Sequence, residues 1–495
     1  MFFSTDPGVA TCDALCRKAM VMAVSSSSQS SSDTHDDGRA AAAYAEVAAR
    51  LDRLPFTSVQ RGILLKGGLT TTFDGLDNGI VSFLLPIVTG VFSLSGVEQG
   101  FLGSSSLIGA FAGAIAVSFI GDRTGRRNLL LYSMAFYSAA MIVGAVSPDG
   151  AFLIVTRVAA GVAIGINVNI IIPYLAEFAP VKQRGHFVGS LAGFFGFGFV
   201  LAALIGYFVI QTMDQGWRIA QLIVGLPIIL AVLWRRNLPE SPRYLLSKGR
   251  IDEARAIIDD LEAKVCRVTG KDLPPVDADV RYEPDKHLSM RSVLEQFAAL
   301  WRPKMLRQTI LIWVLWFCFS FAYYGFLVFL PTLLVDKGLT ISESFGYSIV
   351  IEVAQVLGYY PAAVLSERLD RKWSIVVFLA ASALSAVGLA FAGGNVQVLI
   401  FGIALAFFLN GAYAPLYTYT PEVYPTPIRA TGVGASAVFS RVGAALAPII
   451  MGATYTSLKF SGVFLTLCAV IAVAVVAVVT MGVSTRRRSL EEIAG

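Results

Sequence analysis

Two aspartates stand inside an apolar stretch of the chain. Asp74 and Asp77 lie within residues 67–92, which are long and apolar enough to cross a bilayer as a helix. Their three-residue spacing places both carboxylates on one face of that helix. An ionised side chain near the bilayer centre costs about 2.5–3.5 kcal/mol, so such groups usually meet water, a partner or a proton path. We therefore predict that this face belongs to an ion or substrate route; a purely structural contact between helices is the alternative.

A second buried charge occurs near the other end of the chain. Arg441 lies in the apolar stretch 432–455, and a guanidinium has no accessible neutral form, so it needs an anion. Glu352, in the stretch 342–366, would make the contact structural if it supplied that anion. Alternatively, Arg441 binds a substrate carboxylate through a forked pair of hydrogen bonds. Glu352 would then be an additional proton site or the resting partner of Arg441, and the sequence leaves this open.

Aromatic residues crowd the second half of the chain. A wall of rings beside one arginine suits a flat aromatic carboxylate better than a polyhydroxylated sugar. Asn78 adds a polar group from the first half. The candidate substrate-binding residues are therefore Arg441, Asn78, Phe321, Tyr324, Tyr413 and Glu352.

The composition identifies the chain as a membrane protein. Of its 495 residues 55% are hydrophobic and only 15% charged, against about 25% charged in soluble domains, and the mean hydropathy is +0.67. Twelve stretches are long enough to cross a membrane. They lie near residues 67–92, 97–120, 129–147, 151–175, 187–210, 217–236, 308–334, 342–366, 374–393, 396–417, 432–455 and 459–482.

Lys and Arg gather in the loops on one side of these spans, which predicts that both termini are cytoplasmic. The same bias accounts for the net charge of +5, so the charge gives no reason to expect a nucleic-acid partner. We divide the chain into a disordered cytoplasmic tail (1–60), an N-terminal six-helix bundle (61–236), a cytoplasmic linker with amphipathic helices (237–307), a C-terminal six-helix bundle (308–482) and a cytoplasmic tail (483–495).

The two halves repeat one another at a constant offset. Pro86, which ends FLLP, and Pro331, which ends VFLP, are 245 positions apart. The loop segments DRTGRR and ERLDRK, which begin at Asp122 and Glu367, have the same offset. So do EFAPVKQR and EVYPTPIR, which begin at Glu177 and Glu422. A shared register indicates duplication of a six-helix unit, an arrangement typical of transporters.

These motifs also carry a family resemblance. GDRTGRR resembles the signature loop of the major facilitator superfamily, and PESPRY at 239–244 resembles the sugar-porter branch. FDGLDNG in the first span, the aromatic run 316–331 and YTYTPEVYPTPIRATGVG resemble the metabolite:proton symporters, which include niacin permeases and aromatic-acid symporters. The resemblance covers about residues 60–485 and implies the major facilitator fold with two six-helix pseudo-repeats.

The resemblance implies a proton-coupling role for the first half. Asp77 aligns with the first-span acid that, in sugar porters, pairs with an arginine at the position of Arg157. An ion pair lowers the pKa of an aspartate, and loss of the pair in a dry cavity raises it, so protonation can switch a helix contact. Asp74 is the alternative titrating group.

The resemblance also implies cytoplasmic gates and an anionic substrate. The gating charges would be Asp122, Arg126, Arg127, Glu177, Arg184, Glu367, Arg371, Glu422 and Arg429. Related organic-anion carriers have arginine at the position of Arg441, whereas sugar porters have a glutamine pair in the seventh span that this chain lacks.

We therefore expect an all-α protein with twelve spans that works by alternating access as a symporter of protons and a small organic anion. Nicotinate or another aromatic acid is the first candidate substrate. The protein would work as a monomer in the cytoplasmic membrane, with no cofactor and no metal. A sugar or polyol symporter, a drug or metabolite exporter, and a membrane sensor that transports nothing are the alternatives. An enzyme is not expected, because the chain has three histidines, no nucleophile–base cluster and no nucleotide-binding glycine loop.

Overall fold

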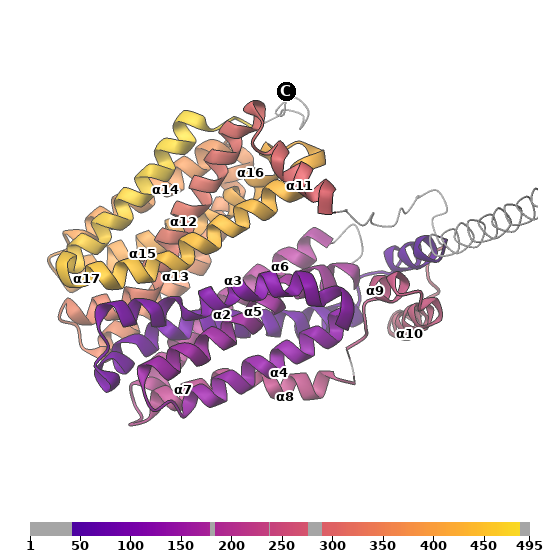
Figure 1. Ribbon diagram of the computed structural model, residues 1–495, viewed down its shortest axis with the longest axis horizontal. Helices are drawn as coiled ribbons and strands as arrows, with labels where there is room; N and C mark the ends of the chain where they lie inside the picture. The colour runs from indigo at the N-terminus through magenta and orange to yellow at the C-terminus, as the bar shows by residue number, and fades with distance from the viewer. Residues whose placement is uncertain (1–41, 179–183, 237, 276–289, 486–495) are drawn as a thin grey trace, which may run out of the picture. The chain divides into compact units, whose positions relative to one another are not determined.

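The computed structural model describes residues 42–178, 184–236, 238–275 and 290–485 (Figure 1). Within these ranges the chain forms helices and no β-strand, and twelve helical segments are long and apolar enough to cross a membrane. The expectation of an all-α membrane protein with twelve spans is thereby confirmed.

Six spans form the N-terminal bundle, drawn in indigo to magenta in Figure 1. Its helices are α2 (Ser58–Phe92), α3 (Gly96–Thr124), α4 (Arg126–Ala145), α5 (Gly150–Phe178), α6 (Arg184–Ile205) with the π-helical η2 (Gly206–Ile210), and α7 (Gly216–Val224) followed by α8 (Pro227–Trp234).

The other six spans form the C-terminal bundle, drawn in red through orange to yellow. Its helices are α12 (Pro303–Asp336), α13 (Ile341–Arg368), α14 (Arg371–Ala390), α15 (Asn395–Gly411) followed by α16 (Tyr413–Val423), and η3 (Thr426–Ile428) leading into α17 (Arg429–Met481). Three short helices lie between the bundles in sequence: α9 (Pro242–Ser247), α10 (Ile251–Thr269) and α11 (Met290–Ala299).

Several spans are less regular than the hydropathy pattern predicts. The sixth span breaks into α7 and α8 at Gly225 and Leu226, where Pro227 opens a new helix. The tenth span breaks at Ala412. The last two spans join in α17, which kinks at Lys459, whose φ of 52° lies in the left-handed region. Apolar composition fixes the length of a span and says little about such breaks.

Helix caps show the internal repeat in three dimensions. Ser95 accepts a hydrogen bond from the backbone of Glu98, whose side chain accepts one from the backbone of Ser95, which is a complete capping box at the start of α3. Thr340 and Glu343 form the same box at the start of α13. Each pair of equivalent residues is 245 positions apart, so the duplicated unit retains its local structure as well as its motifs.

The two bundles touch where α3 begins and the first part of α17 ends. The Ser104 hydroxyl on α3 donates to the carbonyl of Ala445 at 2.6 Å. A Cβ added at Gly100 would stand 2.6 Å from the Pro448 carbonyl oxygen, and one at Gly452 would stand 2.2 Å from the Gly96 carbonyl oxygen. Only glycine allows the backbones to approach this closely.

A separate compact unit contains the N-terminal helix (residues 42–52), α9, α10 and Glu177; the other unit contains α11 and nearly all of the twelve spans. Residues 1–41 of the tail that we expected to be disordered lie outside the described part of the chain. Residues 42–52 are helical, so the expected disorder does not extend to residue 60. The apolar positions of this helix account for the difference, because Ala43, Val47, Ala48 and Leu51 are buried.

Candidate functional site

A buried ion pair lies in the N-terminal bundle. Asp77 on α2 and Arg157 on α5 are both 0% exposed, and Arg157 Nη2 lies 3.2 Å from Asp77 Oδ1. The same nitrogen donates to the Asp77 carbonyl at 3.0 Å and to the hydroxyl of Ser106, on α3, at 3.1 Å. One guanidinium nitrogen therefore joins three helices at the pair that the family resemblance implies.

The bonding of this pair is incomplete. Asp77 Oδ2, Arg157 Nε and Arg157 Nη1 are buried and make no hydrogen bond to a described residue. Buried charges that are bonded through one atom each recover little of their desolvation cost. Removing either partner would leave the other charge buried without compensation, which is strongly destabilising.

Asp74 lies one turn before the ion pair and has no counter-ion among the described residues. It is 3% exposed, and its Oδ2 makes no hydrogen bond there. The Asn78 amide donates to the main-chain oxygen of Asp74 at 2.8 Å, so it bonds the backbone of its own helix rather than a carboxylate. The buried hydroxyl of Tyr137 interacts electrostatically with both acids and with Arg157. Asp74 and Asp77 thus share one buried polar cluster.

Arg441, on α17 in the C-terminal bundle, has a different environment. It is partly buried, and no carboxylate of a described residue lies within ion-pair distance of its guanidinium. Its electrostatic neighbours are the hydroxyls of Tyr324 on α12 and Tyr417 on α16. The guanidinium therefore interacts electrostatically with phenol groups rather than with a carboxylate.

Tyrosine and tryptophan rings form a continuous cluster around these neighbours. Tyr413 stacks on Tyr417 with centroids 5.5 Å apart, and meets Tyr323 edge-on at 5.3 Å. Trp316 lies 5.1 Å from Tyr417 and donates its indole N–H to Thr420. Tyr417 is 59% exposed, so this end of the ring cluster is accessible.

Glu352, on α13, is an electrostatic neighbour of Tyr323 in this ring cluster. It is 3% exposed, makes no hydrogen bond or ion pair with a described residue, and interacts electrostatically with Tyr323. No ion pair joins it to Arg441, so the structure does not show the resting partnership considered from the sequence. Phe321 is buried against Phe317 at 6.1 Å, and no ring contact with the tyrosines is observed.

Two of the expected gating charges of the second repeat form an ion pair. Arg371 Nε, at the start of α14, lies 3.1 Å from Glu422 Oε1 on α16. Arg429 instead donates to the carbonyl of Tyr424 and to the hydroxyl of Thr426. The side chain of Glu367 lies outside the described part of the chain.

In the first repeat, Glu177 accepts a hydrogen bond from Ser241, the residue that also caps α9. The guanidinium of Arg127 donates to the carbonyl of Arg235, and Arg126 also has an interaction partner. The structure does not describe the side chains of Asp122 and Arg184. Glu177 therefore ties the end of α5 to the PESPRY segment, a link that the sequence alone did not indicate.

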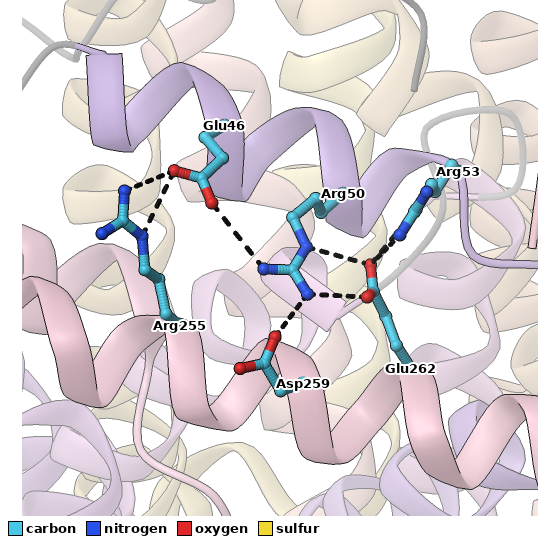
Figure 2. Close-up of polar contacts among 6 residues, drawn as sticks. All are labelled: Glu46, Arg50, Arg53, Arg255, Asp259 and Glu262. Carbon is cyan, nitrogen blue, oxygen red and sulfur yellow. Dashed lines mark hydrogen bonds and ion pairs between the residues drawn. The ribbon is translucent and has the colours of Figure 1, made fainter. Parts of the chain in front are cut away.

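Charged residues also join the N-terminal helix to α10 (Figure 2). Glu262 on α10 accepts hydrogen bonds from Arg50 and Arg53 of the N-terminal helix. Asp259 pairs with Arg50, and Arg255 pairs with Glu46. The hydrogen bond with Glu262 raises the pKa of Arg50. Burial alone would raise the pKa of Glu262, but the hydrogen bonds from the two arginines outweigh it and lower that pKa below its usual 4.5.

Sequence reasoning missed three residues that the structure places at these sites. Ser106 bonds Arg157, Tyr417 neighbours Arg441, and Gln355 donates to the hydroxyl of Tyr323 at 2.8 Å. Residue type alone did not single out these three among the other serine, tyrosine and glutamine residues of the chain. The three-residue spacing of Glu352 and Gln355 was the one available signal, because it places them on one face of α13.

Comparisons with known proteins agree with this fold. Residues 19–495 match the family model described as Sugar (and other) transporter. The niacin transporter NiaP of Acinetobacter baylyi is 34% identical over 90% of this chain and 99% of its own length. The putative niacin/nicotinamide transporter NiaP of Bacillus subtilis is 33% identical over 87% and 98%.

Among solved structures, the Escherichia coli xylose transporter XylE in a partially occluded inward-open conformation superposes with a TM-score of 0.69. The alignment covers 88% of this chain and all of XylE at 17% identity, which shows the fold alone. The matched family and these relatives are transporters rather than enzymes. The chain therefore belongs to the sugar (and other) transporter family, within the major facilitator superfamily.

Proposed function

We propose that the chain is a proton-coupled symporter of a small aromatic carboxylate, with nicotinate as the first candidate. One observation carries the proposal. One bundle holds a buried ion pair that leaves polar atoms without hydrogen bonds, and the other holds an arginine that has tyrosine neighbours and no described carboxylate partner. Sequence similarity to niacin transporters over almost the whole chain supports nicotinate as the first substrate to test.

The proton step uses the Asp77–Arg157 pair. When a proton binds Asp77, the carboxyl loses its negative charge, the attraction to Arg157 falls, and α2 and α5 are released from one another. When the proton leaves, the pair forms again. Asp74 either accepts the proton first or changes the electrostatic potential at Asp77. Either order couples one proton to a change in packing between the same two helices.

The substrate step uses Arg441. Its guanidinium donates two parallel hydrogen bonds to the carboxylate, and the rings of Tyr413 and Tyr417 offer flat surfaces on which an aromatic ring can stack. Binding then draws α12, α16 and α17 together around the ligand. The glycine contacts between α3 and α17 let the bundles close on one side of the membrane, while the ion pair of Arg371 with Glu422 acts on the other. The loop charge bias supports cytoplasmic termini.

The test is uptake of labelled nicotinate into proteoliposomes that contain the full chain. An inward proton gradient should accelerate uptake in the wild type and have no effect in Asp77→Asn. Asp74→Asn separates the two acids, because the titrating residue is the one whose loss removes the gradient effect. Uptake that is indifferent to the gradient in the wild type would reject symport. Uptake of a sugar with no uptake of nicotinate or benzoate would reject the anionic substrate.

A further inference from the structure

Tyr137, on α4, is a buried polar residue that the proposed proton step does not use. Its hydroxyl is buried and makes no hydrogen bond to a described residue. A buried phenol usually has a hydrogen-bond partner, because a buried polar group without one costs free energy. One carboxylate oxygen of Asp74 and one of Asp77 are buried and unbonded in the same way. All three groups therefore have hydrogen-bonding capacity that the described contacts leave unused.

Contacts one turn earlier on the helices show how α4 lies beside its neighbours. The Thr70 hydroxyl on α2 lies 4.0 Å from the Met134 sulfur on α4, and Ser133 on α4 donates to an asparagine side chain of α5. Residues three or four apart share a helical face. Asp74 follows Thr70 by four positions, and Tyr137 follows Met134 by three. Tyr137 and Asp74 therefore lie one turn further along the two faces that meet at the Thr70–Met134 contact.

The Tyr137 hydroxyl interacts electrostatically with Asp77, Asp74 and Arg157. Arg157 Nη2 is bonded to Asp77 Oδ1, which leaves Asp77 Oδ2 open to a further donor. A phenol can donate one hydrogen bond and accept another at the same time. It can therefore donate to a charged Asp77 while it accepts from a protonated Asp74. No other side chain type in this cluster can do both without becoming charged.

Resting on the proposed function, we propose that Tyr137 relays the proton between Asp74 and Asp77. The O–H bond of Asp74 breaks as its proton forms an O–H bond with the phenol oxygen, and the phenol's own proton moves to Asp77. One proton is transferred, and Tyr137 is neutral before and after the step. Asp74 is then the acid that receives the proton first, and Asp77 is the acid whose neutralisation releases Arg157.

The experiment compares two rates for labelled nicotinate in proteoliposomes that contain the full chain. One is uptake driven by an inward proton gradient, and the other is exchange against unlabelled nicotinate, which needs no gradient. Tyr137→Phe removes the hydroxyl and keeps the ring, so gradient-driven uptake should fall about tenfold while exchange stays at the wild-type rate. The matched control Tyr132→Phe, which removes a hydroxyl from an exposed tyrosine of the same helix, should change neither rate.

Two further variants separate a relay from a structural contact. Asp74→Asn and Tyr137→Phe block the same step of a relay, so the double variant should be no slower in gradient-driven uptake than either single variant. Independent losses would instead multiply to about 100-fold. Tyr137→His should retain part of the rate, because an imidazole can accept a proton at one nitrogen and donate one from the other.

The possible failures can be told apart. Wild-type uptake by Tyr137→Phe, an equal fall of uptake and exchange in that variant, or a double variant with multiplied losses would overturn the relay. Thermal unfolding shows whether Tyr137→Phe is folded. If it is not, Tyr137→His carries the test, and normal exchange with uptake as slow as that of Asp74→Asn would overturn the relay. A wild type that exchanges no nicotinate, or whose uptake ignores the gradient, would reject the proposed function itself.

Discussion

The two bundles derive from one repeated unit, yet their buried charges occupy different positions. At the 245-residue offset, Asp77 and Arg157 correspond to Ala322 and Gly402. Glu352 and Arg441 correspond to Leu107 and Gly196. None of these four charges has a charged equivalent in the other half.

The environments differ as much as the positions. In the N-terminal bundle the opposite charges touch and are sealed from solvent. In the C-terminal bundle no ion pair joins Arg441 to Glu352, and each has tyrosines as electrostatic neighbours. A buried ion pair suits a small ligand such as a proton. Charged side chains that are not paired with each other suit a larger charged molecule. The proposed mechanism therefore divides the work, with proton binding in one bundle and substrate binding in the other.

The largest expected effect is the loss of substrate binding in the C-terminal bundle. Arg441→Ala removes two charge-assisted hydrogen bonds, each of about 1.5–3 kcal/mol, so nicotinate affinity should fall by at least 100-fold. Arg441→Lys keeps the charge but not the fork, and should lose on the order of tenfold. Equilibrium binding of labelled nicotinate measures both. Equal losses in the two variants would show that the charge is unimportant.

A substitution between the bundles should also have a large effect, on transport rather than on binding. Gly100→Leu inserts a side chain where even a Cβ would stand 2.6 Å from the Pro448 carbonyl oxygen, so α3 and α17 cannot close. Uptake should stop while nicotinate binding persists. Gly90→Ala is the control, since nothing lies within 4 Å of its Cβ. Normal uptake by Gly100→Leu would show that this contact is not part of the transport cycle.

An intermediate effect is expected at the ion pair of the N-terminal bundle. Ser106→Ala removes one of the three hydrogen bonds made by Arg157 Nη2, worth about 1 kcal/mol. Arg157 is then held less firmly between α2, α3 and α5, so gradient-driven uptake of nicotinate should fall about fivefold. The initial rate of gradient-driven uptake measures this loss. Ser105→Ala, whose hydroxyl bonds only within α3, should leave the rate unchanged.

The smallest effect is expected outside the membrane, where charges join the N-terminal helix to α10. The pKa of Glu262 is lowered, so its stabilising contribution is full above the usual value of 4.5 and is lost as the pH falls through the lower, folded-state value. Glu262→Gln should therefore loosen residues 42–52 at neutral pH by well under about 1 kcal/mol, because the cluster is partly exposed. Hydrogen exchange of those residues measures it. If acid and the variant have no effect, packing alone holds the helix.

Much of the fold could be predicted because hydropathy and repeated motifs are local signals. Twelve apolar stretches, the offset between Glu177 and Glu422, and acids inside α2 all follow from residue types. The breaks at Gly225 and Ala412, the kink at Lys459 and the helix over residues 42–52 depend on packing between distant segments, which one sequence does not reveal. For the same reason the pairing of Asp77 with Arg157 came from family resemblance, while the roles of Ser106 and Gln355 required coordinates.

The division of work between the bundles is tested most directly by comparing two assays in the same proteoliposomes. Counterflow measures exchange of labelled for unlabelled nicotinate, and gradient-driven uptake measures coupling to protons. Asp77→Asn should keep counterflow and lose gradient-driven uptake, whereas Arg441→Ala should lose both. If Asp77→Asn abolishes counterflow, or if Arg441→Ala retains it, the assignment of proton and substrate to separate bundles is contradicted.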